Sequence, residues 1–89
     1  MPKKGYGAKN MNGKQITLTQ LSRNQKARII RLDGGRGFQR KLRLMGIREG
    51  QIAYIVSRQP LRGPLTIVVG KNEITLGRGM ANKITVEAI

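Results

Sequence analysis

A short amphipathic helix that glycine must end, followed at once by a strand, is the feature that most constrains this fold. On such a helix the side chains of Phe38, Leu42 and Met45 lie at i, i+4 and i+7 and form one apolar stripe. Gly46 follows the stripe, at the position where a left-handed C-cap favours glycine. We therefore predict that the helix ends at Met45 and that a small β-structure wraps around its buried side.

Arginines occupy the opposite side of the predicted helix. Arg36, Arg40 and Arg43 share that side, and their guanidinium groups are suited to binding carboxylates or phosphates through paired hydrogen bonds. The alternative is a solvated helix face that binds nothing. The pattern alone does not separate the two interpretations.

Short segments with β-branched or period-two patterns predict about five strands, over residues 26–32, 52–57, 65–69, 73–76 and 84–88. Pro60 and Pro64 cannot donate to a sheet, so residues 59–64 are predicted to form a loop. The turn at residues 70–72 predicts a hairpin. A single helical turn is expected within residues 16–24, and a loop or single turn within residues 77–83.

Strands this short and close together favour a small barrel, because closing the sheet removes its exposed edges. Residues 1–15 hold four lysines, three glycines, a proline and two asparagines, a composition that cannot repay the entropy of ordering. We therefore predict a flexible basic tail at residues 1–15 and one mainly β domain at residues 16–89.

The charge of the chain is strongly positive and uneven. Eighteen Lys and Arg residues against four acids give +14. Thirteen bases and one acid leave +12 in residues 1–48, whereas five bases and three acids leave +2 in residues 49–89. Such a field favours anionic partners, whether nucleic acid, an acidic protein surface or lipid headgroups.

The chain lacks the residue types that most enzymes and metal sites use. It has no histidine and no cysteine, and its four acids are dispersed along the sequence at Asp33, Glu49, Glu73 and Glu87. We predict no catalytic residue, no cofactor and no specific iron or other metal site. The glycines around Arg36 are not followed by the Gly-Lys-Ser/Thr sequence that ends a nucleotide-binding loop, so we interpret them as a flexible connection.

No apolar run approaches the ~20 residues that span a bilayer, and the first residues do not continue into the apolar core of a signal peptide. We expect a soluble intracellular protein.

Leu44 projects away from the apolar stripe, and Leu61 sits between Pro60 and Arg62 at a loop tip, so either leucine is a candidate partner contact. The alternative is that Leu44 flanks the core and Leu61 folds back over the end of the barrel.

Five short segments follow one another in a characteristic order across residues 17–89. They are Leu18-Thr19-Gln20-Leu21, Lys26-Ala27-Arg28-Ile29, Leu42-x-x-Met45-Gly46-Ile47-x-x-Gly50, Pro60-Leu61-x-Gly63-Pro64 and Leu76-x-x-x-x-Ala81-x-x-Ile84-x-Val86. Their order and spacing resemble the FeoA family, small SH3-like proteins associated with ferrous iron uptake, and the similar C-terminal domain of iron-dependent repressors. The resemblance implies a small SH3-like barrel.

The resemblance also implies a non-catalytic, cytoplasmic accessory protein that regulates ferrous iron transport by binding FeoB, a membrane protein with a GTPase domain. The protein would reach the membrane through that partner and would take no small-molecule substrate. Homo-oligomer formation stays open. The candidate partner-binding residues are Leu44, Leu61, Arg36, Arg40, Arg43, Pro60 and Arg62.

The alternative function is a small basic nucleic-acid-binding or transcription-related SH3-like module. The charge of +14 motivates it, because charge alone gives weak, salt-sensitive contact with nucleic acid or another anionic surface. Two tyrosines and one phenylalanine leave little for base stacking. We therefore place this function second.

Overall fold

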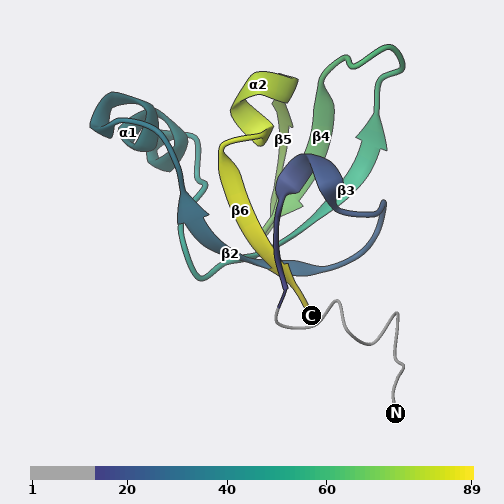
Figure 1. Cartoon of the computed structure of the whole chain (residues 1–89), viewed down its shortest axis with the longest axis horizontal. Helices are drawn as coiled ribbons and strands as arrows, with labels where there is room; N and C mark the ends of the chain where they lie inside the picture. The colour runs from purple at the N-terminus through teal and green to yellow at the C-terminus, as the bar shows by residue number, and fades with distance from the viewer. Residues whose placement is uncertain (1–13) are drawn as a thin grey trace.

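A computed structural model describes residues 14–89, in which six strands form one antiparallel sheet (Figure 1). The spatial order of the strands is β1-β6-β2-β3-β4-β5. The strands are β1 (Gln15–Thr17), β2 (Ala27–Leu32), β3 (Ile52–Arg58), β4 (Leu65–Val69), β5 (Asn72–Leu76) and β6 (Ile84–Ala88). Three helical segments connect them: η2 (Leu18–Gln20), α1 (Arg36–Leu44) and α2 (Arg78–Ala81).

The predicted mainly β fold with one amphipathic helix is confirmed, with two differences in the sheet. It has six strands rather than about five, and the two edge strands, β1 and β5, do not pair with each other, so the sheet is not closed. The added strand β1 pairs with residues 85–87 of β6. A strand of three residues with a single apolar side chain is too short to show a period, so β1 was not predicted. Residues 1–13 of the predicted basic tail lie outside the described residues.

The centre of the sheet follows the predicted pattern closely. Strand β3 lies between β2 and β4, as its apolar residues on both faces predicted. Strands β4 and β5 form the predicted hairpin, with Val69 opposite Asn72 and a two-residue turn between them. Alternate residues of β4 face the core, and all three of these are buried: Leu65, Ile67 and Val69.

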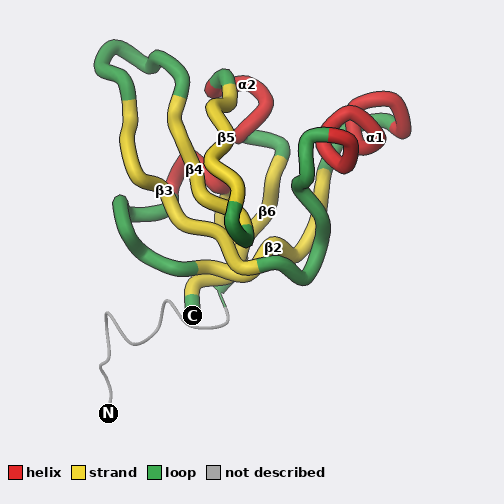
Figure 2. Tube along the Cα trace, turned by 180° about the vertical axis from the view of Figure 1, so that it is seen from behind, coloured by secondary structure: helices red, strands yellow, loops and turns green. Residues whose placement is uncertain are grey.

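The sheet is curved, as the view from behind in Figure 2 shows. Seventeen hydrophobic residues within residues 14–89 are buried in the core. The largest of them come from strands β2 to β6, from η2 and α1, and from the connecting residues Leu21 and Ile47. The segment η2 closes one side, with Leu18 fully buried. Its start is capped because the backbone N–H of Thr17 donates to Gln20 Oε1 at 2.9 Å, so the expected helical turn is confirmed.

The glycine stop after α1 is confirmed, with the helix ending one residue before the predicted Met45. The helix ends at Leu44, Met45 caps it, and Gly46 adopts a φ of +98°. The N–H of Ile47 donates to the carbonyl of Leu42 at 2.9 Å, and the N–H of Gly46 to that of Arg43 at 3.0 Å. This pair of bonds is the Schellman motif. Leu42 and Ile47 are both fully buried, so the helix end is fastened to the core.

The expectation that the sheet wraps around α1 is wrong. The helix lies beside the sheet, beyond the end of β2 (Figures 1 and 2). Of the predicted stripe, Leu42 alone is fully buried, while Phe38 and Met45 are half-buried against the core. A nine-residue helix with one deeply buried side chain covers the side of a small sheet and cannot fill its centre.

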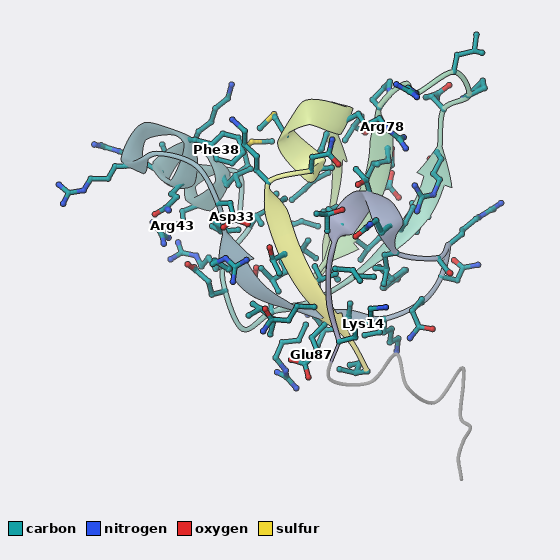
Figure 3. All side chains as sticks on the ribbon, in the orientation of Figure 1. Lys14, Asp33, Phe38, Arg43, Arg78 and Glu87 are labelled. Carbon is teal, nitrogen blue, oxygen red and sulfur yellow. The ribbon has the colours of Figure 1, made fainter. Side chains whose placement is uncertain are left out.

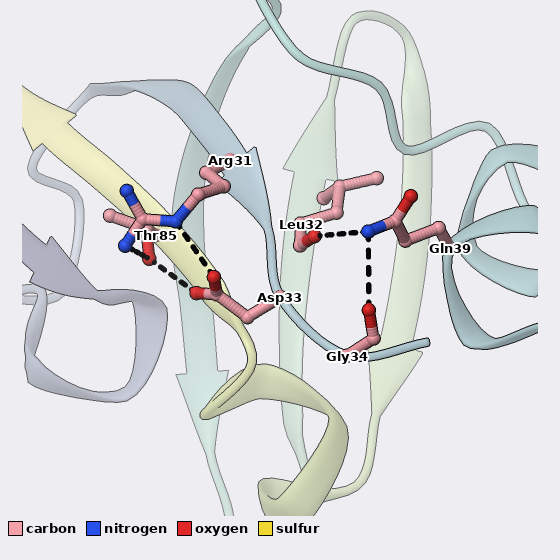
Figure 4. A network of polar contacts seen from close by, with 6 residues as sticks. All are labelled: Arg31, Leu32, Asp33, Gly34, Gln39 and Thr85. Atoms are coloured by element: carbon pink, nitrogen blue, oxygen red, sulfur yellow. Dashed lines mark hydrogen bonds and ion pairs between the residues drawn. The ribbon is translucent and has the colours of Figure 1, made fainter. Parts of the chain in front are cut away.

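A polar network fastens the end of β2 to β6 and to α1 (Figure 4). Asp33 accepts hydrogen bonds from Arg31 Nε at 2.7 Å and from the Thr85 hydroxyl at 2.8 Å. Gln39 of α1 donates from Nε2 to the carbonyls of Leu32 at 2.9 Å and Gly34 at 3.2 Å. The helix is therefore oriented by its first turns as well as by its buried end.

The hydrogen bond from Arg31 is the main reason that the pKa of Asp33 lies below its ordinary value, and the bond from Thr85 lowers this pKa further. A carboxyl whose pKa is lower in the folded state stabilises that state above its unfolded pKa of about 3.9, and the contribution is lost as the pH falls through the folded pKa. We expect the wild type to lose stability on acidification below about pH 4 more steeply than Asp33→Asn. Urea unfolding across this range measures the difference, and parallel curves would contradict it.

Candidate functional site

A shallow hollow on the outer face of α1 collects most of the predicted partner-binding residues. Its volume is about 530 Å³, and it is lined by Arg36, Gln39, Arg40, Arg43, Leu44 and Arg48. The helical spacing predicted that the arginines at 36, 40 and 43 share a face, and the structure brings them together there. We call this set of six residues the arginine hollow.

Leu44 is the apolar member of the arginine hollow. It is the last residue of α1, and its side chain is 79% exposed. The alternative that it flanks the core is therefore wrong. An exposed leucine surrounded by guanidinium groups combines an apolar contact with a positive rim.

One guanidinium of the hollow already holds a carboxylate. Arg43 Nη2 lies 3.0 Å from Glu49 Oε2 and 3.4 Å from Glu49 Oε1. Within residues 14–89 the other ion pair is Arg31–Asp33, so Arg36, Arg40 and Arg48 have no acidic partner among the described residues. The hollow thus carries an excess of unpaired positive charge.

Two members of the hollow were not among the predicted site residues. Gln39 lies in the helix beside the arginines, where it also fastens α1 to β2. Arg48 follows the glycine stop, and the Schellman turn brings it back to the last turn of the helix. The signal that could have found Arg48 is Ile47, because an apolar residue directly after the capping glycine marks this turn.

The remaining candidates lie on the loop between β3 and β4. In both views this loop and α1 stand on opposite sides of the molecule (Figures 1 and 2). Leu61 is 98% exposed at its tip, with Pro60 and Arg62 also exposed beside it. The alternative that Leu61 folds back over the end of the sheet is wrong. The predicted residues therefore form two separate surfaces.

The tip of this loop has an unusual backbone. Leu61 and Arg62 adopt φ angles of +59° and +61°, and the N–H of Gly63 donates to the carbonyl of Pro60 at 3.1 Å. This is the geometry of a type I′ turn, whose central positions favour Asn and Gly. A Cβ on Gly63 would stand 2.7 Å from the Cβ of Gln59, so the loop closes too tightly for a larger residue there.

The two surfaces present exposed leucine and arginine side chains. Among residues 14–89 no three acidic, histidine or cysteine side chains gather where they could hold a metal ion. In the same part of the chain, neither α1 nor the shorter helical segments have the length and apolar character needed to cross a membrane. Figure 3 shows the charged side chains spread over the outside of the sheet and α1, with Arg43 far from Arg78.

Comparison with known proteins places this fold in one family. The FeoA domain family matches residues 16–88. No curated protein matches the sequence. The crystal structure of an iron uptake regulatory protein (FeoA) is 25% identical, with a TM-score of 0.78, over 85% of this chain and 100% of that chain.

Two other solved structures show the same likeness. Iron(II) transport protein A from Clostridium thermocellum is 34% identical, with a TM-score of 0.78, over 83% of this chain and 46% of that chain. A manganese-dependent transcriptional repressor shares the fold at 16% identity, with a TM-score of 0.77, over 84% of this chain and 42% of that chain. Because the FeoA family match spans nearly all the described residues, the chain belongs to the FeoA family.

Proposed function

We propose that this protein is a non-catalytic, cytoplasmic accessory of ferrous iron transport that binds and regulates the membrane GTPase transporter FeoB. The observation that carries the proposal is the FeoA family match over residues 16–88, because this family is associated with ferrous iron transport. The two exposed surfaces supply contacts of the kind that an accessory protein needs. The protein would be associated with the membrane only through its partner.

Leu61 supports a docking role most directly. A leucine that is 98% exposed gains by burial against a partner, and a full burial of this side chain stabilises a complex by about 1.5–3 kcal/mol. The left-handed turn holds it at the tip of a short loop. A side chain presented on a defined turn loses less entropy on binding than one on an open loop.

Co-purification of FeoB from the same organism with the tagged chain, in detergent at about 0.15 M salt, tests the proposal. We expect wild type to retain FeoB and Leu61→Asp to lose most of it, because a carboxylate cannot be buried in an apolar contact. Leu44→Asp tests the other surface in the same way. Ser22→Asp places the same charge on an exposed loop residue and serves as the matched control.

The outcomes of this experiment are distinct. Loss with either leucine variant but not with Ser22→Asp supports docking and identifies the surface. Absence of FeoB from the wild-type eluate would contradict the proposed function. Equal retention by the wild type and both leucine variants would assign the contact to another surface.

A nucleic-acid-binding module is the second candidate, favoured by the unpaired arginines of the hollow. Its weakness is stacking. Among the described residues the aromatic side chains are Phe38 and Tyr54. Phe38 packs on the core, with its ring centroid 4.9 Å from Lys83 Nζ, and Tyr54 belongs to the central strand β3. Salt titration against DNA and RNA tests this function, because binding by charge alone weakens steeply as the salt concentration rises.

A further inference from the structure

The arginine hollow combines charge and apolar surface in a way that restricts its ligand. Four arginines line it, and three of them lack an acidic partner among the described residues. At its edge stands Leu44, 79% exposed. A purely ionic ligand would satisfy the arginines and leave this leucine in water.

The pairing of Arg43 with Glu49 shows that an arginine of the hollow can hold a carboxylate. Both carboxylate oxygens of Glu49 lie within 3.4 Å of Arg43 Nη2, and both side chains remain partly exposed, at 40% for Arg43 and 43% for Glu49. An exposed pair of this kind is weak and exchanges easily with a carboxylate from outside. Glu49 therefore occupies one of the positions that a partner's carboxylate would take.

The orientation of Gln39 adds a second restriction. Its Nε2 donates to two backbone carbonyls, so the amide oxygen Oε1 is directed away from them as an acceptor (Figure 4). Gln39 lines the hollow, so its amide oxygen, which is not used in these two bonds, suits a ligand that carries N–H groups. A peptide backbone has them, whereas an ionised phosphate or a lipid phosphodiester offers no donor.

We propose that the arginine hollow binds an acidic, leucine-containing segment of a partner protein. Carboxylates of the segment pair with Arg36, Arg40 and Arg48, and an apolar side chain covers Leu44. The inference rests on the proposed function for the identity of the partner, but the chemistry of the bound segment is defined by the hollow alone.

Nucleic acid fits less well because the hollow contains no aromatic side chain on which bases stack. A flat membrane fits less well because α1, which contains Leu44, and the β3–β4 loop, which contains Leu61, lie on opposite sides of the molecule.

A fluorescein-labelled peptide of alternating glutamate and leucine, added to the full chain at low salt, tests the inference by fluorescence anisotropy. We expect the peptide to bind and its glutamine counterpart to fail. Arg40→Gln should weaken binding by about threefold to tenfold, the loss expected for one charge-assisted pair at a partly exposed site. Leu44→Ala should weaken it by a similar factor, because the apolar contact is lost.

Glu49→Gln is the most specific variant, because it should tighten binding. Removing the internal carboxylate frees Arg43, so we expect an affinity about twofold to fivefold higher. Glu87→Gln changes the net charge equally, and Lys14→Gln matches the charge change of Arg40→Gln. Both control residues lie away from Arg43 in Figure 3, and both variants should leave the affinity within about twofold.

Several results would overturn the inference. They are failure of the peptide to bind, equal weakening by Lys14→Gln and Arg40→Gln, or equal tightening by Glu87→Gln and Glu49→Gln. Tighter binding of single-stranded RNA or phosphatidylglycerol vesicles that Arg40→Gln abolishes would reassign the hollow to those ligands. If the peptide binds but FeoB does not co-purify, the proposed partner is rejected and the peptide-binding role of the hollow is kept. If FeoB co-purifies but the peptide does not bind, only the role of the hollow is rejected.

Discussion

Replacing Leu42 with alanine is expected to lower the free energy of unfolding by about 2–4 kcal/mol. Leu42 is fully buried in the core, and its carbonyl accepts the bond from Ile47 that closes the helix. The substitution removes the one deeply buried side chain of α1 and leaves a cavity at its junction with the sheet. Urea unfolding followed by circular dichroism measures the change.

Leu44→Ala is the matched control for this prediction. It deletes the same atoms two residues later from a side chain that is 79% exposed, so its effect should stay within about 0.5 kcal/mol. If the two variants proved equally stable, α1 would not be packed on the core as described. The hollow would then have no fixed shape.

The large cost expected at Leu42 follows from the length of the helix. A nine-residue helix is marginal in water on its own, so α1 exists because its buried end and its Gln39 bonds hold it to the sheet. The arginines on its outer face therefore depend on residues that never touch a ligand. Loss of peptide binding by Leu42→Ala would be a consequence of lost structure.

The sequence predicted the elements whose pattern is local. Strands β4 and β6 have the predicted bounds. The stop at Gly46 was predicted because a glycine follows the apolar stripe, and the structure gives this residue the expected left-handed φ of +98°. The short helix α2 was expected only as a loop or single turn, because its four residues carry too few side chains to show a period. Whether the sheet closes depends on how β1 and β5 lie in space, which no local pattern encodes.

The candidate site was predicted in part for the same reason. The shared face of Arg36, Arg40 and Arg43 follows from helical spacing alone. The exposure of Leu44 and Leu61 does not, because a leucine in any sequence can be turned inward by its surroundings. The arrangement of the candidates as two surfaces on opposite sides likewise required the fold.

Replacing Leu61 by asparagine and Arg62 by glycine together is expected to stabilise the fold by about 1–2 kcal/mol. Both residues hold left-handed backbone angles, which cost non-glycine residues free energy, while Asn-Gly is the preferred pair in a type I′ turn. For a domain of this size the melting temperature should rise by about 5–10 °C. Thermal unfolding followed by circular dichroism measures it, and a lower melting temperature would contradict the turn geometry.

The same double variant should lose FeoB in the co-purification experiment, because the apolar tip is gone while the loop stays closed. Gain of stability with loss of binding is the pattern expected when a strained turn is kept for contact rather than for folding. Leu61→Ala separates the two effects, since it removes the tip and keeps Arg62 in its left-handed position. It should therefore lose FeoB without the rise in melting temperature. If the double variant were more stable and still retained FeoB, Leu61 would not be the docking residue, and the arginine hollow would be the surface that remains.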